Sequence, residues 1–298
     1  MSLKSKISIS ILMCLLLTFF IYSAQVPSVH AWGLGTHRFI ASEAIEIMPD
    51  DLDWFFLMYS DVIIDWSIKP DTVFKASDRN ERYRHWYDLD VPDGENEYYR
   101  GGFPAMNFGV LPWAVEDNFI LLVQSLRDED WERAAQLMGV ISHYTEDITQ
   151  PLHATSDYNP LSNHVSFEHE IDSHLYEISI PDYVPQELDN IFEATMAVAE
   201  ESYGFTGYTE NKLSYWLIRD VLWNDVIQDI TENRIRSAVQ FTANVWYTAM
   251  IQADLETSTT ASEEPSPSAS EGLPIIVTMA IVTMVIVGTV SVLYLKRR

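Results

Sequence analysis

Cysteine is almost absent from this chain of 298 residues, and the only one, Cys14, lies close to its start. Beyond that position no disulfide can close a loop, so the fold must be stabilised by its core or by another kind of cross-link. The same absence excludes a thiolate nucleophile, and no serine motif takes its place. The chemistry of this protein therefore has to come from other side chains.

Basic residues are also scarce, with 18 lysines and arginines against 44 aspartates and glutamates, which gives a net charge of -26. A surface of this sign repels nucleic acid and anionic bilayers, unless bound metal ions dominate the local field. We therefore do not expect a nucleic-acid partner. Most of these acids fit a solvated surface that keeps the protein in solution.

Long apolar runs are confined to the two ends of the chain. Near the start, Lys4 and Lys6 precede an apolar run over residues 11–22, and a small residue, Ala31, stands just before Trp32. This order is typical of a secretory signal peptide, so we predict that residues 1–31 are removed by cleavage after Ala31. An uncleaved anchor is the alternative, which the shortness of the apolar run disfavours.

The second apolar run, residues 273–295, is long enough to cross a hydrocarbon core of about 30 Å as a transmembrane helix. Residues 296–298, Lys-Arg-Arg, follow it directly and form a basic tail that we expect in the cytoplasm. Residues 256–272, rich in Ser, Thr and Pro, cannot bury a core and read as a disordered stalk. These segments predict a single-pass protein of the cell membrane, with its N-terminal domain extracellular.

The remaining stretch, residues 32–255, is long enough for one domain with a sizeable core. Apolar residues there follow a helical period, without a hairpin series or an internal repeat, which predicts an all-α, multi-helix bundle. One long interruption, residues 91–113, is rich in Gly, Pro and aromatics that fit loop packing better than substrate contact. The predicted helices cover residues 38–48, 51–59, 116–127, 129–149, 166–178, 185–203, 211–224 and 231–255.

The most informative motif lies at the end of one predicted helix. His143 and Asp147 stand four residues apart, so both project from the same helical face. Pro151 then turns the chain, which lets His153 return toward the same point. Imidazole nitrogens and carboxylate oxygens are the ligands that Zn²⁺ accepts when thiolate is absent. A solvated helix end with incidental histidines would explain the motif equally well if it stood alone.

Other histidines of the chain occur at similar spacings. His37 lies five residues after Trp32, and Asp71 precedes His85 by fourteen. His164 and Glu168 again stand four residues apart on a predicted helix. Each pair is weak evidence by itself, because core histidines and solvated acids are common. Together they favour a multi-metal centre.

The order of these residues resembles that of the zinc-dependent phospholipase C family, which includes phosphatidylcholine-cleaving bacterial enzymes and clostridial alpha-toxins. It is similar, more distantly, to that of the S1/P1 nucleases. The resemblance covers nearly all of residues 32–255 and none of the stalk or anchor. In that family the mature protein begins with Trp, whose amino group and carbonyl bind zinc, which matches the predicted cut before Trp32.

The resemblance implies an all-α bundle of the phospholipase C and P1 nuclease type that holds three Zn²⁺ ions. Asp71 is also a candidate general base in such enzymes. Clustered zinc ions suit phosphodiester hydrolysis, because they activate water and stabilise a leaving alkoxide. The implied ligand sets are His153, His164 and Glu168 for one ion; Asp71, His85, His143 and a bridging Asp147 for another; and Trp32, His37 and Asp147 for the third.

Two features favour a phospholipid over a nucleic-acid substrate. The last ligand pair is His-x3-Glu, as in the phospholipases, whereas the nucleases use His-x3-Asp. The nucleases also carry disulfides, which residues 32–255 cannot form. Against this, the interval of five between Trp32 and His37 is closer to the nucleases. A zinc nuclease for single strands and a non-catalytic, metal-stabilised surface module stay open as alternatives.

The headgroup is expected to differ from choline. In the choline-specific members, an acid follows the N-terminal Trp by three residues, and two aromatics lie near the metal Asp and His. Here Gly35, Thr72 and Arg82 occupy those positions. A cage for a quaternary ammonium is therefore not expected, and Arg82 suits an anionic or polyol headgroup better. Thr72 and Arg82 are the predicted substrate-binding residues.

Overall fold

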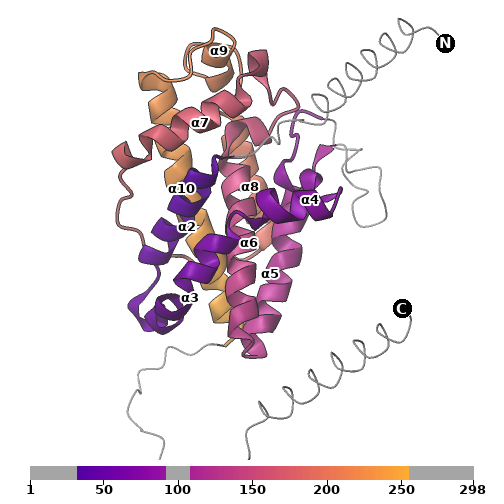
Figure 1. The fold of residues 1–298 in the computed structure, drawn as a ribbon, viewed down its shortest axis with the longest axis vertical. Helices are drawn as coiled ribbons and strands as arrows, with labels where there is room; N and C mark the ends of the chain where they lie inside the picture. The colour runs from indigo at the N-terminus through magenta and orange to yellow at the C-terminus, as the bar shows by residue number, and fades with distance from the viewer. Residues whose placement is uncertain (1–31, 92–107, 255–298) are drawn as a thin grey trace, which may run out of the picture. The chain divides into compact units, whose positions relative to one another are not determined.

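The computed structural model describes residues 32–91 and 108–254, and this part of the chain contains helices and no strand (Figure 1). Seven longer helices form the bundle, and short helical turns connect them. The predicted all-α fold is confirmed for this part. The longer helices are α2 (Leu34–Glu46), α3 (Asp53–Trp66), α5 (Leu111–Arg127), α6 (Trp131–Thr149), α7 (His164–His174), α8 (Ile191–Tyr203) and α10 (Asp225–Gln252).

Helix α6 is the centre of the core, because α3, α5, α8, α10 and α2 all pack against it. From Leu137 to Thr149 every residue of α6 is buried. An α-helix that is enclosed on all sides normally carries apolar residues throughout. Here the second half of α6 instead carries ionisable side chains, His143, Glu146 and Asp147 among them. The polar groups of the last two turns must therefore be satisfied inside the protein.

Helices α3 and α6 approach each other closely at Gly139. A Cβ atom built on this glycine would lie 2.5 Å from the carbonyl oxygen of Ile63 and 2.6 Å from the Cβ of Trp66. Only a glycine lets the two backbones approach this far. The contact lies one helical turn before His143 and includes Trp66, the last residue of α3, which directly precedes Ser67. It therefore sets the distance between the two helices at the polar end of α6.

Helix boundaries differ from the predicted ones where side-chain caps intervene. Helix α8 begins at Ile191 instead of residue 185, because the Asn190 side chain accepts a hydrogen bond from the Glu193 amide. Helix α10 begins earlier than expected, after the Asn224 cap. The expected helix over residues 211–224 shrinks to α9, Leu213–Leu217. Its continuation is broken at Asp220, which adopts a left-handed backbone with φ 58°.

Helix α3 continues to Trp66, beyond the predicted end at residue 59, and helix α5 begins at Leu111 with a proline in its first turn. Trp113 therefore belongs to a helix and not to the long loop. Its ring packs against Tyr87 and Phe192, as expected for a packing role.

The predicted signal peptide (1–31), stalk (256–272), membrane helix (273–295) and basic tail (296–298) lie outside the described residues, as do residues 92–107 of the long loop. Among the helices of residues 32–91 and 108–254, none is both long and apolar enough to cross a bilayer.

Candidate metal centre

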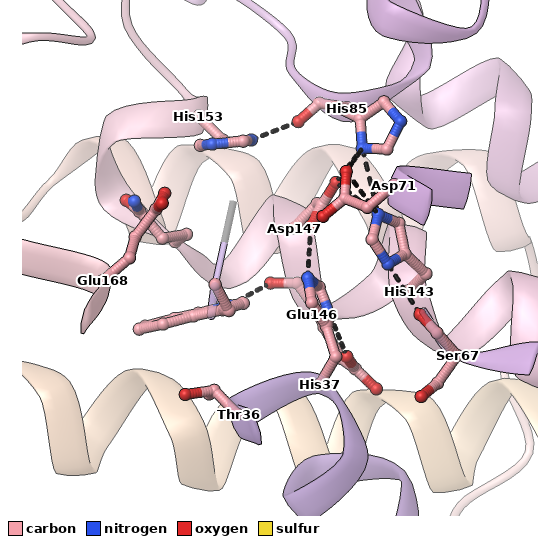
Figure 2. A network of polar contacts seen from close by, with 12 residues as sticks. Thr36, His37, Ser67, Asp71, His85, His143, Glu146, Asp147, His153 and Glu168 are labelled. Atoms are coloured by element: carbon pink, nitrogen blue, oxygen red, sulfur yellow. Dashed lines mark hydrogen bonds and ion pairs between the residues drawn. The ribbon is translucent and has the colours of Figure 1, made fainter. Parts of the chain in front are cut away.

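Eight of the predicted ligands converge at the polar end of α6, in three groups whose ligand atoms lie within 4.8 Å of one another. All of them are buried. Figure 2 shows the first two groups close together and sharing His143, with His153 and Glu168 of the third group to one side. The groups are Asp71, His85 and His143; His37, His143 and Asp147; and His153, His164 and Glu168.

The first group joins three elements. Asp71 lies in the helical turn η2 (Pro70–Phe74), His85 ends the 3-10 helix η3 (Glu81–His85), and His143 comes from α6. His143 Nε2 lies 3.0 Å from His85 Nδ1 and 3.7 Å from Asp71 Oδ1, and His85 Nδ1 lies 3.6 Å from Asp71 Oδ1. Asp147 adjoins this group, since its Oδ2 lies 2.8 Å from His85 Nδ1. Three nitrogen and oxygen atoms therefore face one common point (Figure 2).

The second group places His37, from the first turn of α2, over the last turns of α6. Its Nε2 lies 3.5 Å from Asp147 Oδ1, while its Nδ1 contacts the Glu146 carboxylate. The rings of His37 and His143 stack with centroids 4.1 Å apart. Asp147 therefore has one oxygen toward His85 and the other toward His37, which is the geometry expected of a bridging carboxylate.

The third group joins the segment after α6 to α7. His153 lies in the 3-10 helix η7 (Pro151–His153), where Pro151 turns the chain as predicted. His164 and Glu168 share one face of α7, with His164 Nε2 2.7 Å from Glu168 Oε1. The rings of His153 and His164 meet edge to face at 5.2 Å. Buried Gln150 places its side-chain nitrogen 2.9 Å from His164 Nε2, which holds this ring in place.

The ring orientations fit metal binding. Nδ1 of His143 donates to the carbonyl of Ser67 at 2.7 Å, and Nδ1 of His153 donates to the carbonyl of His85. A carbonyl on one nitrogen fixes the tautomer and leaves the other nitrogen as a ligand. Nε2 of His153 and Oδ1 of Asp147 are buried and make no hydrogen bond within the described part of the chain. Buried polar atoms of this kind are costly unless a ligand such as a metal ion satisfies them.

The electrostatics point the same way. Burial lowers the pKa of His85, His143 and His153, and it lowers the pKa of His164 to about 3. Burial also raises the pKa of Asp147, and neighbouring Asp71 raises it further. The histidines are thus neutral at physiological pH, which is their metal-binding form, whereas the Asp147 carboxyl keeps its proton to a higher pH than an ordinary aspartate. Metal binding at this centre should release protons.

Comparison with known proteins assigns the chain to a family. A sequence model described as zinc dependent phospholipase C matches residues 36–233, which include all eight of these residues. The chain belongs to the zinc-dependent phospholipase C family. It is therefore a zinc-dependent phosphodiesterase, and the predicted family is confirmed.

Relatives and solved structures agree with this assignment. Two phospholipases C of Bacillus cereus are each 21% identical to the chain, one over 244 residues (73% of this chain, 82% of the relative) and one over 261 (75% and 87%). Alpha-toxin from Clostridium absonum matches with a TM-score of 0.53 and 16% identity over 76% of this chain. Alpha-toxin from an avian strain of Clostridium perfringens matches with a TM-score of 0.52 and 12% identity, also over 76%. The chain spans 65% and 66% of the two toxin chains, and at these identities the toxins show a shared fold alone.

Several polar residues of this phospholipase C family member were not predicted. Lys75 contacts Oδ1 of Asp71 one helical turn away, and its charge lowers the pKa of His85. Buried Glu146 supports His37 through its side chain, and burial raises its pKa. Buried Glu81 accepts from the Tyr144 hydroxyl and pairs with Arg84. For Glu146, the only signal in the sequence was an acid within a stretch of otherwise buried helix. Such an acid, taken alone, is usually interpreted as a solvated residue.

The remaining predicted residues lie around the centre. Trp32 is fully buried, and its indole nitrogen donates to the Glu146 carbonyl at 2.7 Å. Thr72 is exposed and its hydroxyl donates to the carbonyl of Ile68, while Arg82 is exposed with its guanidinium 4.5 Å from the centre of the Tyr83 ring. None of these three belongs to the metal groups found within the described residues.

Proposed function

We propose that this protein is a phospholipase C that hydrolyses the phosphodiester bond of phospholipids at a site with three zinc ions. The observation that carries the proposal is the convergence of three nitrogen and oxygen ligand groups on one end of α6, within the region that matches the family. The curated relatives named phospholipase C support the lipid substrate.

The residues that would hold the three ions follow the observed groups. His153, His164 and Glu168 would hold one ion, and Asp71, His85 and His143 another. The third would lie between His37 and Asp147, completed by the amino group and carbonyl of Trp32 after cleavage. Asp147 would bridge the last two ions, since its two oxygens face His85 and His37.

The protein's own groups have distinct tasks in such a site. Bound zinc would supply an activated water and stabilise charge on the phosphodiester oxygens. Asp71, almost fully buried, is the candidate general base that accepts a proton from the attacking water. The carbonyls of Ser67 and His85 hold the His143 and His153 rings in one tautomer, so these rings do not reorient between turnovers.

We propose further that the domain is secreted by its signal peptide and stays on the outer side of the cell membrane through residues 273–295. The sequence pattern of residues 1–31 and 273–298 supports this location. A tethered domain would meet its phospholipid substrate without a diffusion step in solution.

The headgroup proposal rests on Arg82. The side chain is exposed on the short helix that ends at His85, and it lies along the Tyr83 ring. A guanidinium at this place favours an anionic or polyol headgroup over choline. Vesicles of phosphatidylinositol, phosphatidylglycerol and phosphatidylcholine distinguish these headgroups, and strong preference for choline would refute this part. Replacing Arg82 by Gln should then lower the preference without changing the zinc content.

The decisive experiment measures zinc and hydrolysis on the same preparation of the domain beginning at Trp32. We expect about three zinc ions per chain, as the family resemblance and the ligand count predict. Phospholipid vesicles, bis(p-nitrophenyl) phosphate and single-stranded DNA are the substrates. His143→Ala, which removes a ligand from two groups, should abolish lipid hydrolysis. Full zinc content without hydrolysis would indicate a binding module, and preferential cleavage of DNA would indicate a nuclease.

A further inference from the structure

Helix α7 carries a second acidic side chain on the face that bears His164 and Glu168. Asp172 follows Glu168 by four residues, so the three side chains form one row over roughly 12 Å of helix. His164 and Glu168 belong to the third metal group. Asp172 instead reaches the N-terminal arm, which we define as residues 32–37.

The Asp172 carboxylate caps helix α2 from another part of the chain. Its Oδ1 accepts hydrogen bonds from the amide of Thr36 at 2.9 Å and from the Thr36 hydroxyl at 2.7 Å. Helix α2 has no cap of its own, because Gly33 at the cap position has no side chain and the first turn contains no acid. A carboxylate is what this helix end requires, both for its free amides and for its dipole.

The arm also packs closely against this carboxylate. A Cβ atom on Gly33 would lie 2.2 Å from Asp172 Oδ2, and one on Gly35 would lie 3.0 Å from Oδ1. Gly33 has φ -58° and ψ 153°, a conformation open to any residue. The absence of a side chain at position 33 is therefore explained by the approach of Asp172 and not by the backbone angles.

We propose that Asp172 is a positioning residue that fixes the N-terminal arm on α7, so that His37 stays in ligand position beside Asp147. Thr36, which Asp172 holds by two hydrogen bonds, directly precedes His37 in the chain. Helix α7 then links two metal groups, with His164 and Glu168 in one and the arm of the other held by Asp172. This inference rests on the proposed function only in that a metal binds at His37.

The alternative is that Asp172 caps α2 and stabilises the fold without affecting the metal centre. Zinc binding separates the two, measured by stoichiometry and by competition with a chelating dye. We expect Asp172→Ala to lower the affinity for one of the three zinc ions by about ten-fold or more and to leave the other two ions in place. A loss of this size is usual when a residue that holds a metal ligand in position is removed. Asp172→Asn keeps an oxygen for both Thr36 donors and should recover most of the loss. Glu170→Ala, on the same helix but in contact with His174, is the matched control and should bind zinc as the wild type does.

A second measurement does not depend on metal. In the zinc-free protein, hydrogen exchange of the amides in residues 33–40 should become faster in Asp172→Ala than in Glu170→Ala. Gly33→Ala should also make hydrogen exchange in this segment faster. The double variant Gly33→Ala/Asp172→Ala should exchange little faster than Gly33→Ala, because Asp172→Ala removes the carboxylate that the new methyl group meets. Unchanged zinc affinity in Asp172→Ala, or additive effects of the two substitutions, would overturn the proposal. A wild type without zinc would refute the proposed function, while hydrogen exchange would still decide whether Asp172 positions the arm.

Discussion

Gly139 allows a direct test of how the fold supports the metal centre. In Gly139→Ala the new methyl carbon would lie 2.5 Å from the Ile63 carbonyl oxygen. Carbon and oxygen atoms approach to about 3.3 Å, so α3 and α6 would have to separate by roughly 0.8 Å. Ser67 follows the last residue of α3, and its carbonyl accepts from His143 Nδ1 at 2.7 Å. A separation of this size would stretch that bond to about 3.5 Å, beyond hydrogen-bonding range.

The expected stability change is the difference of two terms. Overpacking costs about 1–3 kcal/mol, and replacing a helical glycine by alanine returns about 0.5–1 kcal/mol. The net loss of about 1–2 kcal/mol corresponds to a decrease in melting temperature of roughly 3–6 °C for a domain of this size. Because His143 loses the carbonyl that orients its ring, zinc affinity should fall by about 10-fold or more.

Thermal unfolding with and without chelator, together with a zinc competition assay, would measure both effects. Gly204→Ala is the control, since its Cβ would meet only backbone atoms of its own chain neighbourhood, at 3.0 Å or more, after the end of α8. It should change stability little and zinc affinity not at all. If Gly139→Ala bound zinc as tightly as the wild type despite losing stability, the link between helix spacing and ring orientation would be wrong.

Three further outcomes are expected. Lys75→Met should slow the extraction of zinc by chelators, because the Lys75 ammonium competes with a metal ion for the Asp71 carboxylate. Lys69→Met is the control: it breaks a similar ion pair with the exposed Asp65 and should not change the rate of zinc extraction. Burial and neighbouring Asp90 raise the pKa of Asp88 to about 7. The free energy of unfolding of the wild type therefore falls as the pH rises from about 4 to 7. In urea denaturation, Asp88→Asn should be more stable than the wild type by roughly 1–2 kcal/mol at pH 8 and equally stable at pH 4. For each histidine like His164, whose pKa is about 3 in the folded state, the free energy of unfolding of the zinc-free protein should fall by about 1.4 kcal/mol per pH unit below pH 6.5. The reason is that the unfolded chain gains the proton and the folded chain does not. A denaturation midpoint that stays constant between pH 7 and 5.5 would contradict this.

The helical pairs of the site could be predicted from the sequence because the helical period is local. His143 with Asp147, and His164 with Glu168, stand one turn apart, so each pair had to share a face once the helix formed. The turn at Pro151 was also local. Placing Asp71, His85 and His37 beside them required the family resemblance, because no spacing rule joins residues more than fifty positions apart.

Other features could not be predicted because they depend on tertiary contacts. Glu146 looks like a solvated acid in the sequence, yet the packing around α6 buries it against His37. Asp172 and Thr36 lie 136 residues apart, so nothing local connects them. Helix α3 continued past its predicted end because Ile63 and Trp66 pack on Gly139, a contact that depends on another helix.

The burial of Trp32 has a practical consequence for anyone who produces this protein. Its side chain is fully enclosed and its indole nitrogen is bound to the Glu146 carbonyl. A purification tag or leftover protease-site residue placed directly in front of Trp32 would start from a fully buried residue instead of from the surface of the protein. Recombinant domains should therefore carry their labels after Gln252, where α10 ends, and should have their first residue verified by mass spectrometry before any zinc or activity measurement is interpreted.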